Sequence, residues 1–284
     1  MRADSLSTEP DSLPFTVYID EPERLWADSH RAETPTQLIV TPVELHQRNI
    51  ERRLRETDRP KSNLDLQSIH GVAKAVIKGP TETLDRLDRL ALLRTVLDGE
   101  CAESVQRLAQ VIGTPLSAHV EDVEQARVEV ALVTGFTQTR LEAFADAVTN
   151  TDQHTRRDTD DLLAGLSKLQ ATLRDRLEQR SSNGTHPTRA LSETDLLTRA
   201  TRTLVDNPDR WATVYPDIET LAVAGASMLS APLEDFCRLV ATTTDVDVEL
   251  HLRAATGPAI REQLCSHPTV DDPGTQEVYD GTAR

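Results

Sequence analysis

The residues of this sequence best suited to contact a polyanion lie between positions 41 and 70. Arginines are concentrated between residues 48 and 59, in a chain whose formal net charge is −16. Guanidinium groups bind phosphate oxygens, and hydroxyl or imidazole groups can donate further hydrogen bonds to a nucleic-acid backbone. Arg48, Arg52, Arg53 and His70 are therefore candidate contacts to a phosphate backbone.

The same residues have a simpler structural interpretation. Glu51, Glu56 and Asp58 are interleaved with the arginines. Acidic and basic residues three or four positions apart form ion pairs on a solvated helix face. A histidine that follows a strand, as His70 does, is also commonly a hydrogen-bonded structural residue. The sequence leaves both interpretations open.

No other group of side chains forms a recognisable catalytic or metal site. The three cysteines are far apart and lack the paired spacing of a zinc site or a disulfide framework, so we expect buried thiols. The acidic run at residues 158–161 matches no calcium loop. We therefore predict no catalytic residue, cofactor, metal or small-molecule substrate, and a protein that is not an enzyme. The cysteines are Cys101, Cys237 and Cys265.

Three strand-and-helix units precede residue 80. Residues 15–20 read as a short buried strand, and the acid and proline that follow predict the start of a helix. A second strand at 37–40 leads into Thr41-Pro42-Val43-Glu44, which predicts a helix with Thr41 as its N-cap. This helix would direct Ile50 and Leu54 toward the core. A third strand, at 64–67, precedes a helix that ends before residue 80, and this alternation predicts a parallel sheet.

The strand pattern disappears after residue 80 and returns late in the chain. Leucines at positions 162, 166, 169, 173 and 177 predict a helix packed in a hairpin or a short coiled coil. Strand patterns return at 221–224 and 246–252. We therefore predict a disordered leader at 1–13, an α/β domain formed by 14–80 and 206–264, an all-helical insertion at 81–205, and a disordered tail at 265–284.

The order of these pieces resembles the first motor domain of superfamily 1 helicases. It is more closely similar to the degenerate form of that domain at the N-terminus of AddB- and RecC-type subunits of helicase–nuclease complexes. The strand ending at Thr41, and the strand followed by Ser68 and His70, match helicase motifs that face single-stranded DNA. Residues 215–225 resemble the segment that carries the second nucleotide motif. The resemblance covers about residues 15–252 and implies a RecA-like, P-loop NTPase-like sheet.

The nucleotide motifs implied by this resemblance lack their functional residues. A P-loop needs glycines that expose backbone amides, a lysine for the phosphates, and a serine or threonine for Mg²⁺. Residues 20–23 read Asp-Glu-Pro-Glu instead, and we expect their carboxylates to repel a triphosphate. The second motif normally ends in acidic residues that hold Mg²⁺, whereas residues 224–227 read Ala-Gly-Ala-Ser. We therefore expect no functional P-loop and no ATPase activity.

The composition and the resemblance together define the functional expectation. An acidic surface with few lysines is typical of a halophilic, haloarchaeal-type protein, and we expect no signal peptide, no membrane span and a cytoplasmic location. The leading hypothesis is a non-catalytic helicase-like domain or subunit that supports DNA repair or recombination, through single-stranded DNA or a partner helicase or nuclease. The alternatives are a protein-interaction scaffold without a nucleic-acid role, or a truncated remnant of a longer AddB-like protein.

Overall fold

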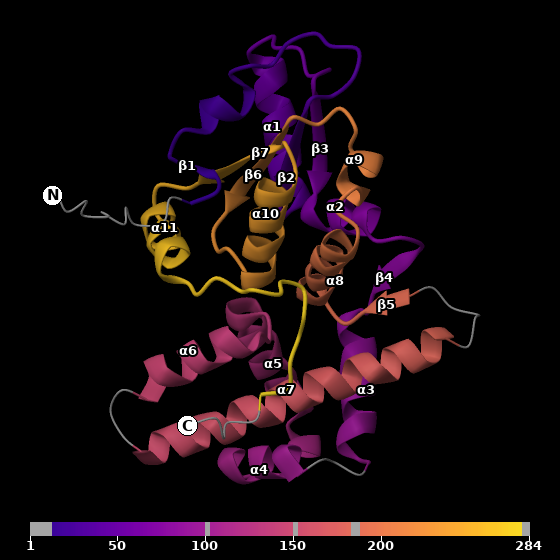
Figure 1. Cartoon of the computed structure of the whole chain (residues 1–284), viewed down its shortest axis with the longest axis vertical. Helices are drawn as coiled ribbons and strands as arrows, with labels where there is room; N and C mark the ends of the chain where they lie inside the picture. The colour runs from indigo at the N-terminus through magenta and orange to yellow at the C-terminus, as the bar shows by residue number, and fades with distance from the viewer. Residues whose placement is uncertain (1–12, 100–102, 150–152, 183–187, 280–284) are drawn as a thin grey trace, which may run out of the picture. The chain divides into compact units, whose positions relative to one another are not determined.

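The computed structural model describes residues 13–99, 103–149, 153–182 and 188–279. The chain divides into two compact units (Figure 1). The first consists of Met1–Ile69, Tyr215–Leu229 and Val240–His267. The second consists of His70–Val214, Ser230–Leu239 and Pro268–Arg284, and therefore extends beyond the predicted insertion on both sides.

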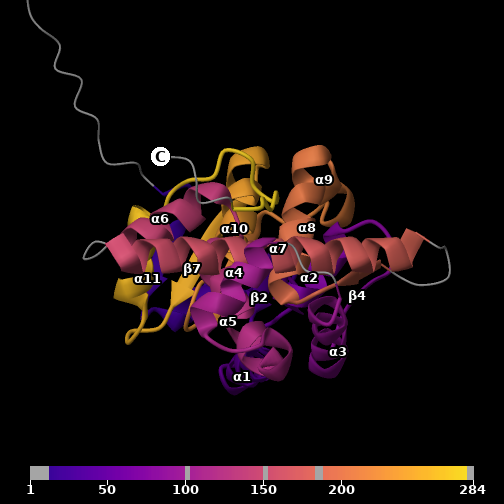
Figure 2. The same cartoon turned by 90° about the horizontal axis from the view of Figure 1, so that it is seen from below.

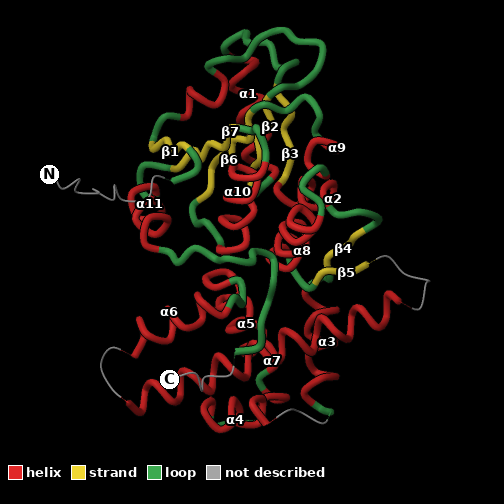
Figure 3. The backbone as a smooth tube through the Cα atoms, in the orientation of Figure 1, coloured by secondary structure: helices red, strands yellow, loops and turns green. Residues whose placement is uncertain are grey.

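The first unit contains a five-stranded sheet with the order β1-β7-β6-β2-β3. Each pair of neighbouring strands is parallel, which confirms the predicted parallel sheet. The carboxyl ends of the strands consequently meet at one edge, where open α/β sheets bind their ligands. Figure 3 shows the strands in yellow. They are β1 (Thr16–Ile19), β2 (Gln37–Thr41), β3 (Leu64–Ser68), β6 (Thr220–Ala226) and β7 (Asp247–Leu252).

The central strands are apolar because both faces of the sheet are buried. Leu38, Ile39 and Val40, successive residues of β2, are each 0 % exposed. Such continuous apolar runs are characteristic of strands in parallel sheets. One face packs against α1 (Glu44–Glu56), whose Ile50 and Leu54 join Ile39 in one hydrophobic cluster. The prediction that these two helix residues face the core is therefore confirmed.

Two further helices of the first unit lie near β1. The segment after β1 forms η1 (Pro22–Trp26), a 3-10 helix of five residues. The carboxylate of Glu21 does not cap η1 but binds Arg24 of the same helix. The helix α11 (Gly257–Ser266) follows β7 and contacts β1. The sequence thus predicts a helix at residue 22 correctly, although the helix is a single short turn.

The second unit is a helical assembly with its own hydrophobic core (Figure 2). Its longest helix, α7, presents Leu166, Leu169, Leu173 and Leu177 to that core, which confirms the predicted leucine stripe. α7 packs against both α4 and α6 instead of forming a separate coiled coil. The helices that belong to this unit wholly or for most of their length are α2 (Ile69–Val76), α3 (Arg86–Leu97), α4 (Glu103–Ile112), η2 (Leu116–Ala118), α5 (Val120–Thr134), α6 (Gln138–Thr149), α7 (Gln153–Ser182), α8 (Glu193–Asp206), α9 (Arg210–Val214) and α10 (Ala231–Thr243).

The segment 81–205 is not entirely helical, which corrects the prediction. Strands β4 (Thr81–Thr83) and β5 (Thr188–Ala190) pair in parallel within the second unit. Three-residue strands are too short to produce the alternation on which strand prediction relies. Their position on either side of α3–α7 brings the two ends of this helical segment together.

The C-terminal segment is also more ordered than its polar composition predicts. Tyr279 is 3 % exposed. Its hydroxyl donates to Asp160 at 2.7 Å, and its amide donates to the Ser167 hydroxyl at 3.0 Å. A disordered tail beginning at residue 265 is therefore wrong for the part that is described. The predicted leader, apart from residue 13, and residues 280–284 lie outside the described residues.

The cysteines differ in their surroundings. Cys237 is completely buried, and this burial raises the pKa of its thiol to about 12. Cys265 is exposed, contrary to the expectation of a buried thiol, and Cys101 lies outside the described residues. No helix in the described part of the chain has both the length and the apolarity needed to cross a membrane.

A buried ion pair within the second unit gives a test of its packing. Arg140 of α6 donates to both carboxylate oxygens of Asp235 of α10, at 2.8 and 2.6 Å, and both side chains are buried. Asp235→Ala leaves the guanidinium without its partner, so we expect a loss of about 3–5 kcal/mol in unfolding free energy. Urea denaturation measures this loss. Asp146→Ala, which removes an exposed partner of Arg156, is the control, and equal effects of the two changes would contradict the buried pair.

Candidate nucleotide-site region of the sheet

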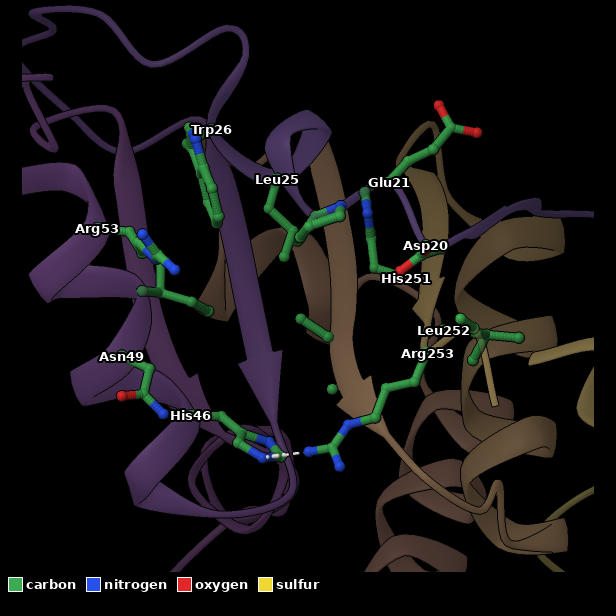
Figure 4. A pocket seen from close by; sticks show the side chains of 15 residues that line it. Asp20, Glu21, Leu25, Trp26, His46, Asn49, Arg53, His251, Leu252 and Arg253 are labelled. Atoms are coloured by element: carbon green, nitrogen blue, oxygen red, sulfur yellow. Dashed lines mark hydrogen bonds between the residues drawn. The ribbon is translucent and has the colours of Figure 1, made fainter. Parts of the chain in front are cut away.

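A cavity of about 300 Å³ opens in the first unit at the carboxyl ends of β1, β6 and β7 (Figure 4). Its walls are mainly apolar, and they include Leu25 and Trp26 of η1, Ile50 of α1, and Ala224 of β6. Leu25, Ile50 and Ala224 also belong to the hydrophobic core between α1 and the sheet. The cavity is therefore an opening in the top of that core, at the edge where a parallel sheet presents its ligand site.

Two basic side chains meet at the rim of the cavity. Arg253, the residue after β7, donates from Nη2 to Nε2 of His46 in the first turn of α1, at 2.6 Å. Burial lowers the pKa of His46, and the positive charge of Arg253 lowers it further. The neutral imidazole therefore accepts at Nε2 and carries its proton on Nδ1. Nδ1 is buried and has no hydrogen-bond partner among the described residues.

Gly225 allows His46 to occupy this position. The backbone of Gly225 has a φ of +75°, and a Cβ there would lie 2.5 Å from Nδ1 of His46. The register between β6 and β7 shifts between Ala224 and Ala226, so Gly225 is the extra residue of a β-bulge. Only a residue without a side chain satisfies both the left-handed backbone and the contact with the imidazole.

A second histidine forms part of another wall of the cavity. His251 of β7 is 5 % exposed, and its Nε2 lies 2.9 Å from the carboxylate of Glu249. Its ring lies 4.9 Å from the ring of Tyr18, centroid to centroid. The guanidinium of Arg24 covers the Tyr18 ring at 4.8 Å. These contacts fix the β1 and β7 side of the cavity.

The turn after β1 does not fit the phosphates of a nucleotide. The amide of Asp20 donates to the carbonyl oxygen of Leu252 at 3.0 Å and so continues the ladder between β1 and β7. Pro22 has no amide proton to offer. Asp20, at a φ of +60°, lines the cavity with a carboxylate. The chain therefore provides negative charge and few free donors where a P-loop provides amides and a lysine.

The carboxylates of this turn are arranged differently from the sequence-based expectation. Glu21 binds Arg24 at 2.5 Å, and Figure 4 shows its carboxylate pointing away from the cavity. Glu23 is not among the residues that line the cavity. Asp20 is thus the main acidic group that an anion would meet, while Arg53 and Arg253 also line the cavity.

The end of β6 does not fit a Mg²⁺ ion. Residues 224–227 contain no carboxylate, and His46 covers the bulge at Gly225. Within the described part of the chain, no group of three histidine, cysteine, aspartate or glutamate side chains could hold a metal. The residues at this edge therefore do not match the two parts of a nucleotide and metal site.

The predicted DNA contacts on α1 are exposed and ion-paired. Arg48 donates to Glu44 at 2.7 Å, and Arg52 lies 3.7 Å from the carboxylate of Glu56. Arg53 also binds Glu56, at 3.4 Å, and it lines the cavity. The contacts of these arginines are thus the ion pairs expected of a solvated helix face. Their side chains remain 61–70 % exposed, so the guanidinium groups are accessible to a ligand.

The remaining candidates are less accessible. Thr41 is 0 % exposed, and its hydroxyl donates to the carbonyl oxygen of Val43 at 3.1 Å. Ser68 lies opposite Thr41 in the register of β2 and β3. His70 belongs to the second unit, where its ring nitrogens lie 3.1 Å from a carboxylate oxygen of Glu193 and 3.3 Å from the Thr83 hydroxyl. These two contacts link His70 to Glu193 and Thr83 within the second unit.

The sequence interpretation missed His46, Arg253 and the importance of Gly225. Arg253 could have been noticed, because side chains that follow parallel strands gather at the ligand-binding edge. No local signal connects His46 with Arg253, which are 207 residues apart.

Comparison with known families identifies the group of proteins to which the chain belongs. The family model described as halobacterial UvrD-like protein matches residues 2–279. The chain belongs to this halobacterial UvrD-like family. The membership supports a helicase-like origin, and the α/β fold with its parallel central sheet is consistent with a RecA-like domain. No curated protein sequence matches the chain.

The contact between Gly225 and His46 can be tested by substitution in this UvrD-like chain. Gly225→Ala adds a Cβ at a left-handed backbone and against the imidazole, so we expect a loss of about 2–4 kcal/mol in unfolding free energy. Gly113→Ala is the matched control, because Gly113 has a φ of +76° and nothing within 4 Å of the added Cβ. We expect this control to lose about 1 kcal/mol.

Chemical denaturation of both variants separates backbone strain from the contact. Replacing His46 by alanine in the Gly225→Ala protein should recover part of the loss. Equal destabilisation by Gly225→Ala and Gly113→Ala, with no recovery, would show that His46 does not lie against Gly225.

Proposed function

We propose that this UvrD-like chain is a non-catalytic, helicase-like protein that supports DNA repair or recombination. It would act by holding single-stranded DNA or by supporting a partner helicase or nuclease. In this respect it would be comparable to the degenerate N-terminal domains of AddB- and RecC-type subunits. Family membership supports the helicase-related part of this proposal, and the geometry at the carboxyl edge of the sheet supports the non-catalytic part.

The observation that carries the non-catalytic assignment is the hydrogen bond from the Asp20 amide to Leu252. Phosphate binding at a strand-to-helix turn requires several backbone amides that point at the anion. Here the first amide of the turn is used by the sheet, and Pro22 lacks one. Arg53 and Arg253 bring positive charge to the same cavity, but neither replaces the amide cradle or a Mg²⁺ ligand.

The exposed face of α1 is the proposed contact for single-stranded DNA. Its ion pairs are solvent-exposed, and such pairs contribute about 0–1 kcal/mol. Phosphate groups can therefore replace Glu44 and Glu56 as partners of Arg48 and Arg52 at little cost. Electrostatic attraction to DNA is strongly screened in concentrated salt, so this contact also depends on the ionic strength at which it is measured.

The proposal that the protein is not an ATPase predicts the outcome of an ATP hydrolysis assay. Purified protein with Mg²⁺ and ATP, with and without single-stranded DNA, should release no more phosphate than the buffer blank, because the turn after β1 offers few free amides and residues 224–227 offer no carboxylate for Mg²⁺. Arg53→Ala and Arg253→Gln serve as matched variants. ATP hydrolysis that co-purifies with the protein over successive chromatography columns, at a rate that falls in either variant, would contradict the non-catalytic assignment.

DNA binding by α1 can be tested through charge reversal. Fluorescence anisotropy with labelled single-stranded DNA should show binding that weakens about tenfold or more in the Arg52→Glu, Arg53→Glu protein, with a shallower dependence on salt. The control is Arg86→Glu, Arg94→Glu, an equal charge change at exposed positions of α3 in the second unit. Equal weakening in both proteins would indicate an unspecific charge effect. No binding at high micromolar protein would favour the scaffold alternative.

A further inference from the structure

Arg253 is an accessible cation that pairs with no carboxylate among the residues that the structure describes, in a chain with a formal net charge of −16. Its side chain is exposed, and its Nη2 donates to a neutral imidazole nitrogen of His46. None of the ion pairs among the described residues includes Arg253. A guanidinium carries five N–H donors in a planar fork, so donors remain for a ligand after the contact with His46 is made.

The cavity beside Arg253 combines this charge with apolar walls. Leu25, Ile50 and Leu252 are each less than a tenth exposed, and they line the cavity together with Trp26. Figure 4 shows His46 and Arg253 at one end of the cavity and Trp26 at the other. A cavity that is mainly apolar, with a few converging polar groups, is the usual form of a small-molecule site. Water gains few hydrogen bonds from such walls, so an apolar group would displace it favourably.

We propose that this cavity binds a small organic anion that has one negatively charged group and an apolar body. The charged group would pair with Arg253 at the rim, and the body would lie against Leu25, Ile50 and Trp26. Asp20 on the β1 side disfavours further negative charge, which distinguishes this ligand class from a nucleoside triphosphate. At the proposed site, the edge of the sheet binds a small organic anion and does not hydrolyse ATP. The proposal does not require DNA binding by α1.

Two fluorescent probes that differ by one sulfonate group test this proposal. The anion is 8-anilinonaphthalene-1-sulfonate, and the neutral comparison is N-phenyl-1-naphthylamine, which has the same aromatic body without the sulfonate. Titration should give saturable binding of the sulfonate at one site per chain. Arg253→Gln should weaken the sulfonate about tenfold or more, because it removes a charge-assisted hydrogen bond. The same change should alter the affinity of the neutral probe less than about twofold, since the apolar walls stay intact.

Two further variants complete the experiment. Arg261→Gln removes an equal charge from an exposed position of α11 and should leave both affinities unchanged. Asn49→Trp narrows the cavity from an exposed position of α1 and should weaken both probes. Circular dichroism and thermal unfolding verify that each variant is folded.

The results separate the proposal from its competitors. Equal sulfonate binding to the natural protein and the folded Arg253→Gln protein would overturn the assignment of the charged group. Unsaturable binding, or binding insensitive to Asn49→Trp, would overturn the cavity as the site. Millimolar ATP with Mg²⁺ should not displace the sulfonate, and displacement by ATP would overturn the distinction between this ligand class and a triphosphate.

Discussion

The hydrogen bond from the Asp20 amide to the Leu252 carbonyl is the constraint on which the edge of the sheet depends. In a parallel sheet, the amides that follow a strand can either bind a ligand or extend the ladder to the next strand. Here the Asp20 amide makes the last hydrogen bond of the ladder between β1 and β7. Asp20, which donates this bond, has a left-handed backbone, and Arg253 is the residue that follows its acceptor, Leu252. Arg253 at the rim and Asp20 in the turn therefore both adjoin the last hydrogen bond between β1 and β7.

A second irregular backbone position, at Gly225 near the end of β6, shapes the opposite side of the cavity from Asp20. The bulge at Gly225 removes a side chain where one would block His46, and the imidazole then lies over the end of β6. Burial and the charge of Arg253 both lower the pKa of His46, so the interaction is that of a cation with a neutral acceptor. The two irregularities leave an apolar cavity between them, bounded by α1 and η1.

The sequence predicted those features that depend on regular repetition along the chain. Alternating strands and helices indicated the parallel sheet, and spacing on α1 indicated that Ile50 and Leu54 face the core. Features that depend on single hydrogen bonds or on contacts between distant residues could not be predicted from the sequence. Thr41 resembles an N-cap, yet α1 begins at Glu44 after Val43, and the Thr41 hydroxyl donates to a carbonyl oxygen instead. The short strands β4 and β5 and the contact between His46 and Arg253 depend on residues far apart in the chain, for which one sequence offers no pattern.

The central claim is that the turn after β1 holds no triphosphate, and nucleotide binding tests it more directly than turnover does. Equilibrium dialysis with labelled ATP and Mg²⁺, in buffer of molar KCl and again in dilute buffer, measures binding without requiring hydrolysis. The account predicts no saturable binding up to millimolar nucleotide in either buffer, because Asp20 and Pro22 leave no amide cradle. One nucleotide bound per chain, with a crystal structure that places its phosphates at residues 20–23, would contradict it.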